Sequence, residues 1–342
     1  MQVNHEYTMT DLSNGNVSSM EELDIDRAIE DANKLIVIGS ALKTGIFSAI
    51  SEEKDIDTLA RELRSDKRAL YIVLEALCTM GYVEKKNDMY IIAEMAKPLF
   101  FEGTDEYVGG YIPHFMNKMK AWLELPLIIR GEKQGRKKPE SIAVFMNAMA
   151  SRPDAVVERV VDECLKTRKD ALIVLDLGGG PGKYSRAFVN RGLKAVLLDM
   201  PETIDHVSRE FGLAGIKDLT LKKGDFTEDG FVKEFKGHSF DIVFMGNITH
   251  IYSEDENRKL FLRAAKLVKK GGIVAIEDFV RGRSPSAEMF AVNMLASTER
   301  GGTWTEAQYR EWLTDAGFGE IEVLDLDGIE KQLITAFLED YL

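Results

Sequence analysis

A glycine-dense loop between an apolar strand and a helix is the feature that most restricts how this chain can fold. The segment Leu175-Asp-Leu-Gly-Gly-Gly-Pro-Gly182 follows an apolar run and precedes a helical pattern over Tyr184–Arg191. Glycine lets the backbone adopt positive φ and approach a ligand closely, and a helix N-terminus adds unpaired N–H donors. Packing alone seldom needs so many glycines in one turn. The loop therefore predicts a ligand site at the end of a buried strand.

Strand-like and helical segments alternate around this loop. Strand-like runs occupy residues 171–177, 194–199, 219–223, 240–246, 272–278, 320–326 and 331–338, and helical patterns separate the first six. The early runs are continuous and apolar, as expected of parallel strands buried on both faces. Only Asp327–Glu330 separates the last two runs, so these two strands should pair antiparallel at one edge. We predict an α/β fold with a Rossmann-like seven-stranded sheet, mostly parallel, with an antiparallel last strand.

The first half of the chain follows a different pattern. Residues 1–20 are polar and read as a flexible leader. Helical periodicity over 24–50, 56–63 and Lys67–Met80 is followed by two strand-like runs around Asn87-Asp88, a hairpin signal. Asp66 is placed to cap the third helix. This order predicts a winged-helix-like unit over residues 21–105, ahead of a cofactor-binding domain over 166–342.

A helical segment over residues 106–165 is expected to connect the two parts and to contribute to a substrate pocket. It is rich in methionine and aromatic residues, which adapt well around a flat apolar ligand. Each of these side chains is equally an ordinary helix-packing residue, and His114 fits a helix surface as well as a pocket. The candidate pocket residues, from this segment and from residues 290–295, are His114, Phe115, Met146, Met149, Phe290 and Met294.

Composition excludes several classes of partner. The 57 acidic and 44 basic residues give a net charge of -13, and this average field repels a phosphate backbone. No apolar run reaches the roughly 18 residues of a membrane span, and the N-terminus lacks a secretion signal. Cys78 and Cys164 match no metal or redox spacing. We expect a cytoplasmic protein without a metal, a nucleic-acid partner or a membrane partner.

Acidic residues stand at the ends of successive strands beside the glycine loop. Asp199 ends the second strand, where a carboxylate can accept both hydroxyls of a ribose. Asp225 ends the third strand, where it can accept an adenine amino group while Phe226 flanks the base. Lys183 replaces the last glycine of a dinucleotide-binding loop, so no pyrophosphate is expected. The predicted cofactor-binding residues are Asp176, Gly178, Gly180, Gly182, Asp199, Met200, Gly224, Asp225, Phe226, Gly246 and Asn247.

Two residues after the fourth and fifth strands are candidates for acid–base chemistry. His250 follows the fourth strand and is one of only 5 histidines, and its ordinary pKa suits proton transfer near neutral pH. Glu277 ends the fifth strand, which neighbours the fourth in this sheet type. We therefore predict that Glu277 orients the imidazole. The alternative for His250 is a loop histidine with satisfied hydrogen bonds and no catalytic role.

Together these motifs resemble the O-methyltransferases of the caffeic acid and hydroxyneurosporene methyltransferase type, from about Asp26 onward. The motifs that carry the resemblance are the winged-helix start, Asp176–Gly182, Leu198–Glu202, Gly224–Phe226, His250–Glu254, Gly271–Glu277 and Glu306–Phe318. The resemblance implies S-adenosylmethionine as cofactor, with Asp176 near its cationic end. It also implies direct methyl transfer to a small-molecule hydroxyl with His250 as general base and Glu277 beside it.

The same resemblance implies a homodimer joined through the N-terminal units, in which the winged helix serves dimerisation. Two positions depart from the family pattern: Ile251 replaces an acid after the histidine, and Gly301–Thr305 lacks a second carboxylate. Methylation of nitrogen or carbon, or chemistry without methyl transfer, therefore stays open. A winged-helix transcription regulator is a further alternative, although Lys67–Met80 is better suited to packing than to phosphate contacts.

Overall fold

The computed structural model describes residues 23–101, 107–135, 141–228, 230–235 and 240–339. The predicted leader, residues 1–20, lies outside this part. The N-terminal elements are α1 (Ile25–Lys43), α2 (Ile46–Ala49), β1 (Lys54–Asp55), α3 (Ile56–Glu62), α4 (Lys67–Thr79), β2 (Val83–Lys86), β3 (Met89–Ile92), η1 (Glu94–Ala96) and α5 (Lys97–Phe100). Their order, helices followed by a hairpin, agrees with the sequence prediction.

Local sequence signals account for the elements of this N-terminal unit. The Asp66 carboxylate accepts a hydrogen bond from Ala69 N at 2.8 Å, so it caps α4 as predicted. Asn87 and Asp88 take positive φ values of 49° and 61°, which the tight turn between β2 and β3 requires. The small core beneath the hairpin includes the stacked rings of Phe47 and Phe100.

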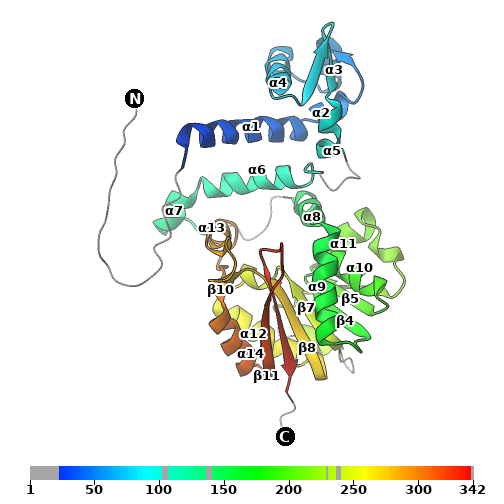
Figure 1. Cartoon of the computed structure of the whole chain (residues 1–342), viewed down its shortest axis with the longest axis vertical. Helices are drawn as coiled ribbons and strands as arrows, with labels where there is room; N and C mark the ends of the chain where they lie inside the picture. Colours follow the sequence, from blue (N-terminus) through cyan, green and yellow to red (C-terminus); the bar gives the residue numbers. More distant parts are fainter. Residues whose placement is uncertain (1–22, 102–106, 136–140, 229, 236–239, 340–342) are drawn as a thin grey trace.

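Four further helices join this unit to the large sheet: α6 (Tyr111–Trp122), α7 (Leu125–Ile129), α8 (Ile142–Ala150) and α9 (Asp154–Thr167). Helix α6 runs alongside α1 (Figure 1). A Cβ atom on Gly39 would come within 2.7 Å of Met116 Cγ. The absence of a side chain at Gly39 of α1 therefore permits the close approach of α6.

The C-terminal half contains the predicted seven-stranded sheet, in the order β11-β12-β8-β7-β4-β5-β6. Its strands are β4 (Ile173–Leu177), β5 (Lys194–Asp199), β6 (Leu219–Lys223), β7 (Phe240–Gly246), β8 (Val268–Asp278), β11 (Phe318–Asp325) and β12 (Gln332–Leu338). Strands β4 to β8 are parallel, and β12 pairs antiparallel with both β8 and β11. Strand β8 begins earlier than expected, because Val268 pairs with Phe240 before a register shift.

Helices cover both faces of this sheet. On one face lie α9, α10 (Lys183–Asn190) and α11 (Pro201–Glu210), and on the other lie α12 (Glu254–Ala265) and α14 (Glu306–Asp315) (Figure 1). Separate apolar cores form on the two faces, one around Phe188 and Phe244, the other around Phe261 and Trp312. Short β9 (Val280–Arg281) and β10 (Trp304–Thr305) flank α13 (Ala287–Ser297). None of the helices in the described ranges is both long and apolar enough to cross a bilayer.

We expect Asp66→Ala to lower the free energy of unfolding of the N-terminal unit by about 1 kcal/mol, because α4 loses its N-cap acceptor. Asp66→Asn keeps an acceptor oxygen and is the matched control. Urea unfolding followed by circular dichroism compares the two variants. Equal losses of stability in both would contradict the capping role.

Candidate active site

A cavity of about 1240 Å³ opens at the carboxyl edge of the parallel strands. The loops after β4, β5, β6 and β7 line one side, and residues of α8 line another. This is the crevice where open α/β sheets bind their ligands. The predicted residues that line it are Asp176, Gly178, Gly180, Asp199, Met200, Asp225, Phe226, Gly246, Asn247, Met146 and Met149.

The glycine loop takes the backbone conformation that its composition predicts. Gly178, Gly180 and Gly182 have φ values of 70°, 50° and 76°, which residues with a Cβ adopt only under strain. Gly182 does not line the cavity among the described residues. It precedes α10, and a Cβ there would lie 2.6 Å from Leu213 Cδ1. Gly182 therefore serves the packing of the turn, whereas Gly178 and Gly180 bring bare backbone to the cavity.

The acid at the end of β5 binds the glycine loop and faces the same cavity. Asp199 Oδ2 accepts a hydrogen bond from Gly180 N at 2.9 Å, and Oδ1 accepts one from Met200 N at 2.7 Å. Each carboxylate oxygen keeps further acceptor capacity, so the side chain can also receive hydroxyl donors from a ribose. Burial raises the pKa of Asp199 above its ordinary value, against these backbone hydrogen bonds.

The next strand ends in the predicted acid–aromatic pair. Asp225 Oδ1 accepts from Thr227 N and Oγ, which fixes the carboxylate at the cavity wall. The Phe226 ring lies edge-on to Tyr252, with centroids 6.0 Å apart, and both rings line the cavity. Bare backbone, a ribose-type acceptor and an apolar base-binding wall thus stand side by side, which fits an adenosine. Gly224 does not line the cavity among the described residues.

Asp176 lies deeper, at the end of β4. Its side chain is buried and accepts a hydrogen bond from Ser185 Oγ at 2.6 Å. Burial, together with the nearby charge of Asp199, raises the pKa of Asp176 to about 7, against the hydrogen bond from Ser185. A buried carboxyl with a raised pKa gains most from a cationic ligand, because the ligand stabilises its ionised form.

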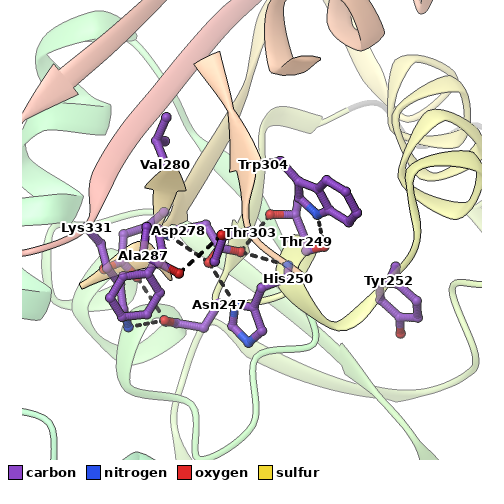
Figure 2. A network of polar contacts seen from close by, with 12 residues as sticks. Asn247, Thr249, His250, Tyr252, Asp278, Val280, Ala287, Thr303, Trp304 and Lys331 are labelled. Carbon is purple, nitrogen blue, oxygen red and sulfur yellow. Dashed lines mark hydrogen bonds and ion pairs between the residues drawn. The ribbon is translucent and has the colours of Figure 1, made fainter. Parts of the chain in front are cut away.

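His250 forms a hydrogen-bonded pair with Asp278. Nδ1 of the imidazole lies 2.7 Å from Asp278 Oδ1 (Figure 2). The same carboxylate accepts from Thr249 Oγ at 2.6 Å, from His250 N at 3.1 Å and from Phe279 N at 2.8 Å. Against the effect of burial, the charge and hydrogen bond of His250, the hydrogen bond from Thr249 and the charge of Lys331 hold the pKa of Asp278 below its ordinary value. An ionised Asp278 fixes the tautomer with the proton on Nδ1.

The prediction that Glu277 lies against His250 is wrong. The Glu277 carboxylate binds Arg152 through both guanidinium Nη atoms, and it accepts from Tyr184 Oη and Asn247 Nδ2, both at 2.9 Å. Successive side chains of a strand point to opposite faces of the sheet. Glu277 therefore faces α9 and α10, while the next residue, Asp278, faces the histidine. The adjacent Glu-Asp pair at the strand end was the sequence signal for this arrangement.

Several predicted pocket residues lie outside the cavity lining, as far as the described residues show. Among them, His114 packs against Phe145, with ring centroids 5.5 Å apart, and Phe145 itself lines the cavity. The Phe290 ring lies edge-on to the His250 ring, with ring centroids 4.8 Å apart. Besides Gly182 and Gly224, the predicted residues absent from the lining are His114, Phe115, Phe290, Met294, His250 and Glu277.

The lining residues that the sequence analysis did not predict include three with polar or charged side chains near the end of β8. Arg152 precedes α9, Tyr184 lies in the first turn of α10, and Lys331 precedes β12. They come from three separate segments, and no spacing in the sequence relates them. Only the antiparallel return of β12 brings Lys331 to the carboxyl edge of β8. In the described part of the chain, no three His, Cys, Asp or Glu side chains are grouped as metal ligands.

The sheet order, the glycine loop and the acids at the strand tips define a Rossmann-like nucleoside-binding enzyme of the methyltransferase class. A family profile described as the O-methyltransferase domain matches residues 132–319. The chain belongs to this O-methyltransferase family, whose methyl donor is S-adenosylmethionine.

Characterised relatives agree with this family membership. The chain is 24% identical over 309 residues to a 3-hydroxy-5-methyl-1-naphthoate 3-O-methyltransferase of Streptomyces sahachiroi, covering 85% of this chain and 88% of that protein. It is 26% identical over 275 residues to a tetracenomycin polyketide synthesis 8-O-methyl transferase of Streptomyces glaucescens, covering 75% and 78%.

Solved structures share the fold. An O-methyltransferase family protein from Burkholderia thailandensis has a TM-score of 0.76 at 20% identity, covering 93% of this chain and 98% of that one. Human N-acetylserotonin methyltransferase in complex with S-adenosylmethionine has a TM-score of 0.72 at 18% identity, covering 94% and 99%.

The raised pKa of Asp176 predicts pH-dependent cofactor binding. Below about pH 7 the free protein holds this carboxyl protonated, and a cationic methionine tail stabilises its ionised form. Binding there must release a proton, so affinity should rise with pH up to about 7 and then level off. The slope is at most about tenfold per pH unit for one proton.

Calorimetric titration with S-adenosylhomocysteine across this pH range measures the slope. Asp176→Asn cannot titrate and should show weaker binding with no slope. A slope that persists in Asp176→Asn would assign the proton to another group, such as Asp199.

Proposed function

We propose that this chain transfers the methyl group of S-adenosylmethionine to a hydroxyl of a small aromatic, polyketide-like or quinone-like molecule, with His250 as general base. The observation that carries the proposal is the His250–Asp278 hydrogen bond of 2.7 Å. Asp278 is the last residue of β8, the strand that pairs with β7. Gly246, the last residue of β7, lines the cofactor cavity. A histidine oriented by a buried carboxylate is the usual arrangement of a protein base.

The roles of the chain's own groups follow from this geometry. Asp278 accepts a hydrogen bond from Nδ1–H of His250. This leaves Nε2 as the unprotonated nitrogen that takes the proton of the acceptor hydroxyl. The imidazolium that forms is stabilised by the adjacent carboxylate. The bound cofactor supplies an electrophilic methyl on a sulfonium. The protein aligns the acceptor oxygen with that methyl and excludes water from the cavity.

The loop that carries His250 is held from behind by the segment after α13. Gly302 N donates to His250 O, and Trp304 Nε1 donates to Thr249 O, both at 3.0 Å. This is the segment that lacks the second carboxylate of the family pattern. We propose that Asp278 serves in place of that carboxylate by orienting the base.

The chemistry of the cavity wall supports a flat, apolar acceptor. Phe145, Met146 and Met149 of α8 and the rings of Tyr107 and Tyr111 line the side opposite the sheet. Two relatives named above are O-methyltransferases of a hydroxynaphthoate and of a polyketide, both fused or aromatic acceptors. A transfer screen with labelled cofactor against phenols, quinones and polyketides tests this acceptor class. Incorporation at nitrogen or carbon alone would favour the alternative reactions.

We expect His250→Gln to lower kcat about 10²- to 10⁴-fold, the usual contribution of a positioned base. Asp278→Asn should lower kcat at least about tenfold, because the imidazole loses its orienting charge. Methyl transfer to an acceptor from the screen measures kcat, and S-adenosylhomocysteine affinity should stay within about twofold of wild type in both variants.

The matched control for this prediction is His206→Gln, on α11 and away from Asp278, which should keep full activity. Glu277→Gln distinguishes the roles of Glu277 and Asp278, because it disturbs the ion pair with Arg152 and leaves the His250–Asp278 hydrogen bond in place. Activity that survives in His250→Gln would exclude base catalysis by this histidine.

We also propose that the chain forms a homodimer through its winged-helix N-terminal unit. Ile25, Ile29 and Ile36 recur along α1 at helical spacing, and their side chains are 57%, 55% and 42% exposed. Exposed apolar residues on one helix face are typical of an interface. Leu123, Leu127 and Ile129 near α7 are exposed as well.

Ile29→Asp should therefore shift the dimer toward monomer, because it places a charge in the apolar contact. Sedimentation velocity at micromolar concentration measures the shift. Met95→Asp changes another exposed apolar side chain outside α1 and is the control. A wild-type protein that sediments as a monomer would contradict the proposal.

A further inference from the structure

The part of the cavity beyond the adenosine contacts contains a group of basic side chains. Asp225, two residues after β6, is suited to the base, and Asp199, the last residue of β5, is suited to the ribose. The rest of the cofactor must then extend across β4 toward β7 and β8, in the order of the sheet. This tail carries one ammonium and one carboxylate. Asp176 is available to the ammonium, so the carboxylate needs a cation on the far side.

Three basic residues line the described cavity: Arg152, Lys183 and Lys331. Lys183 is already saturated, since its Nζ donates to Ala150 O at 3.0 Å and to Arg152 O, and pairs with Asp154 at 2.6 Å. The remaining two side chains bind Glu277, near the end of β8, and Asn247, directly after β7.

Arg152 uses most of its hydrogen-bond donors within the protein. Both of its Nη atoms bind the Glu277 carboxylate, while its buried Nε has no hydrogen-bond partner among the described residues. The pair Arg152–Glu277 is close to neutral as a unit. It therefore brings little net charge to the cavity.

The Lys331 ammonium has hydrogen-bond donors that remain available to a ligand. Its ammonium donates to Asn247 Oδ1 and lies 4.8 Å from the centre of the Phe279 ring, and no carboxylate within the described residues forms an ion pair with it. An ammonium has three donors, so this one keeps donors for a ligand. Burial lowers the pKa of Lys331. An enclosed ammonium without a paired anion is unfavourable unless a ligand provides one.

We propose that Lys331, with Arg152 beside it, binds the carboxylate of the methionine tail of S-adenosylmethionine. The antiparallel pairing of β12 with β8 brings Lys331 to the cavity. Among the described basic residues that line the cavity, Arg152 and Lys183 form ion pairs with carboxylates, and Lys331 does not. Asn247 positions the ammonium through its side-chain oxygen, while its amide donates to Glu277. The inference rests on the cofactor assignment and adds to it the residue that recognises the tail.

The test compares two ligands that differ by this carboxylate alone: S-adenosylmethionine and decarboxylated S-adenosylmethionine. Calorimetry gives the Kd of each for wild type, Lys331→Met and Lys331→Arg. Wild type should bind the carboxylate-bearing ligand at least about tenfold more tightly, about 1.4 kcal/mol. Lys331→Met should remove most of that preference while changing the Kd of the decarboxylated ligand less than about threefold. Lys331→Arg should keep part of it.

Lys194→Met is the matched control, because it removes an exposed lysine at the opposite, amino end of β5 and should change neither Kd. Undiminished binding of the decarboxylated ligand also shows that Lys331→Met is folded. Equal weakening of both ligands would overturn the proposal, as would unchanged affinity for both with a raised KM for the acceptor, which would assign Lys331 to the acceptor. Wild type that binds neither ligand would instead refute the cofactor assignment.

Discussion

The carboxylate of Asp199 joins the ends of two neighbouring parallel strands through backbone N–H groups of Gly180 and Met200. This contact fixes the glycine loop relative to the acid that faces the cavity. The positive φ of Gly178 and Gly180 is what lets the loop turn beneath the carboxylate without a side chain in the way. The cofactor cavity thus depends on a hydrogen bond within the protein as much as on any group it offers to a ligand.

The two acids at the end of β8 divide the chemistry of the site between the two faces of the sheet. Asp278 holds the histidine on the side of α13, where the ring of Phe290 packs against it. Glu277 gathers Arg152, Tyr184 and Asn247 on the other side. One strand therefore separates the group proposed to take a proton from the groups proposed to surround the cofactor tail. The alternation of side chains along a strand is sufficient to explain this division.

The N-terminal half supplies the wall of the cavity that the sheet lacks. Helix α8 carries Phe145, Met146 and Met149 over the glycine loop, and α6 packs against both α8 and α1. The close contact at Gly39 fixes α6 on α1. A change in the packing of α1, such as association with a second chain, is therefore connected to the α8 wall of the cavity through the contacts of α6 with α1 and with α8.

The sequence by itself determined the alternating strands and helices, the antiparallel final pair, the glycine loop and the acids of β4 to β6. Each of these is specified locally, by apolar runs, by positive φ at glycine or by a polar residue directly after a strand. Candidate residues on helices were less well assigned: Met146 and Met149 line the cavity, whereas His114, Phe115 and Met294 do not. Helical periodicity gives the buried face but not the neighbour it is buried against.

Only the tertiary structure decided which acid forms a hydrogen bond with His250 and which basic side chains line the cavity. The choice between Glu277 and Asp278 depends on the register of β8 within the sheet, because a shift of one residue exchanges the faces. Arg152, Tyr184 and Lys331 belong to three segments that are far apart in the sequence. The packing of α9 against α10 and the antiparallel pairing of β12 with β8 bring them together. Contacts of this kind are fixed by packing and topology, which a linear pattern of residue types does not encode.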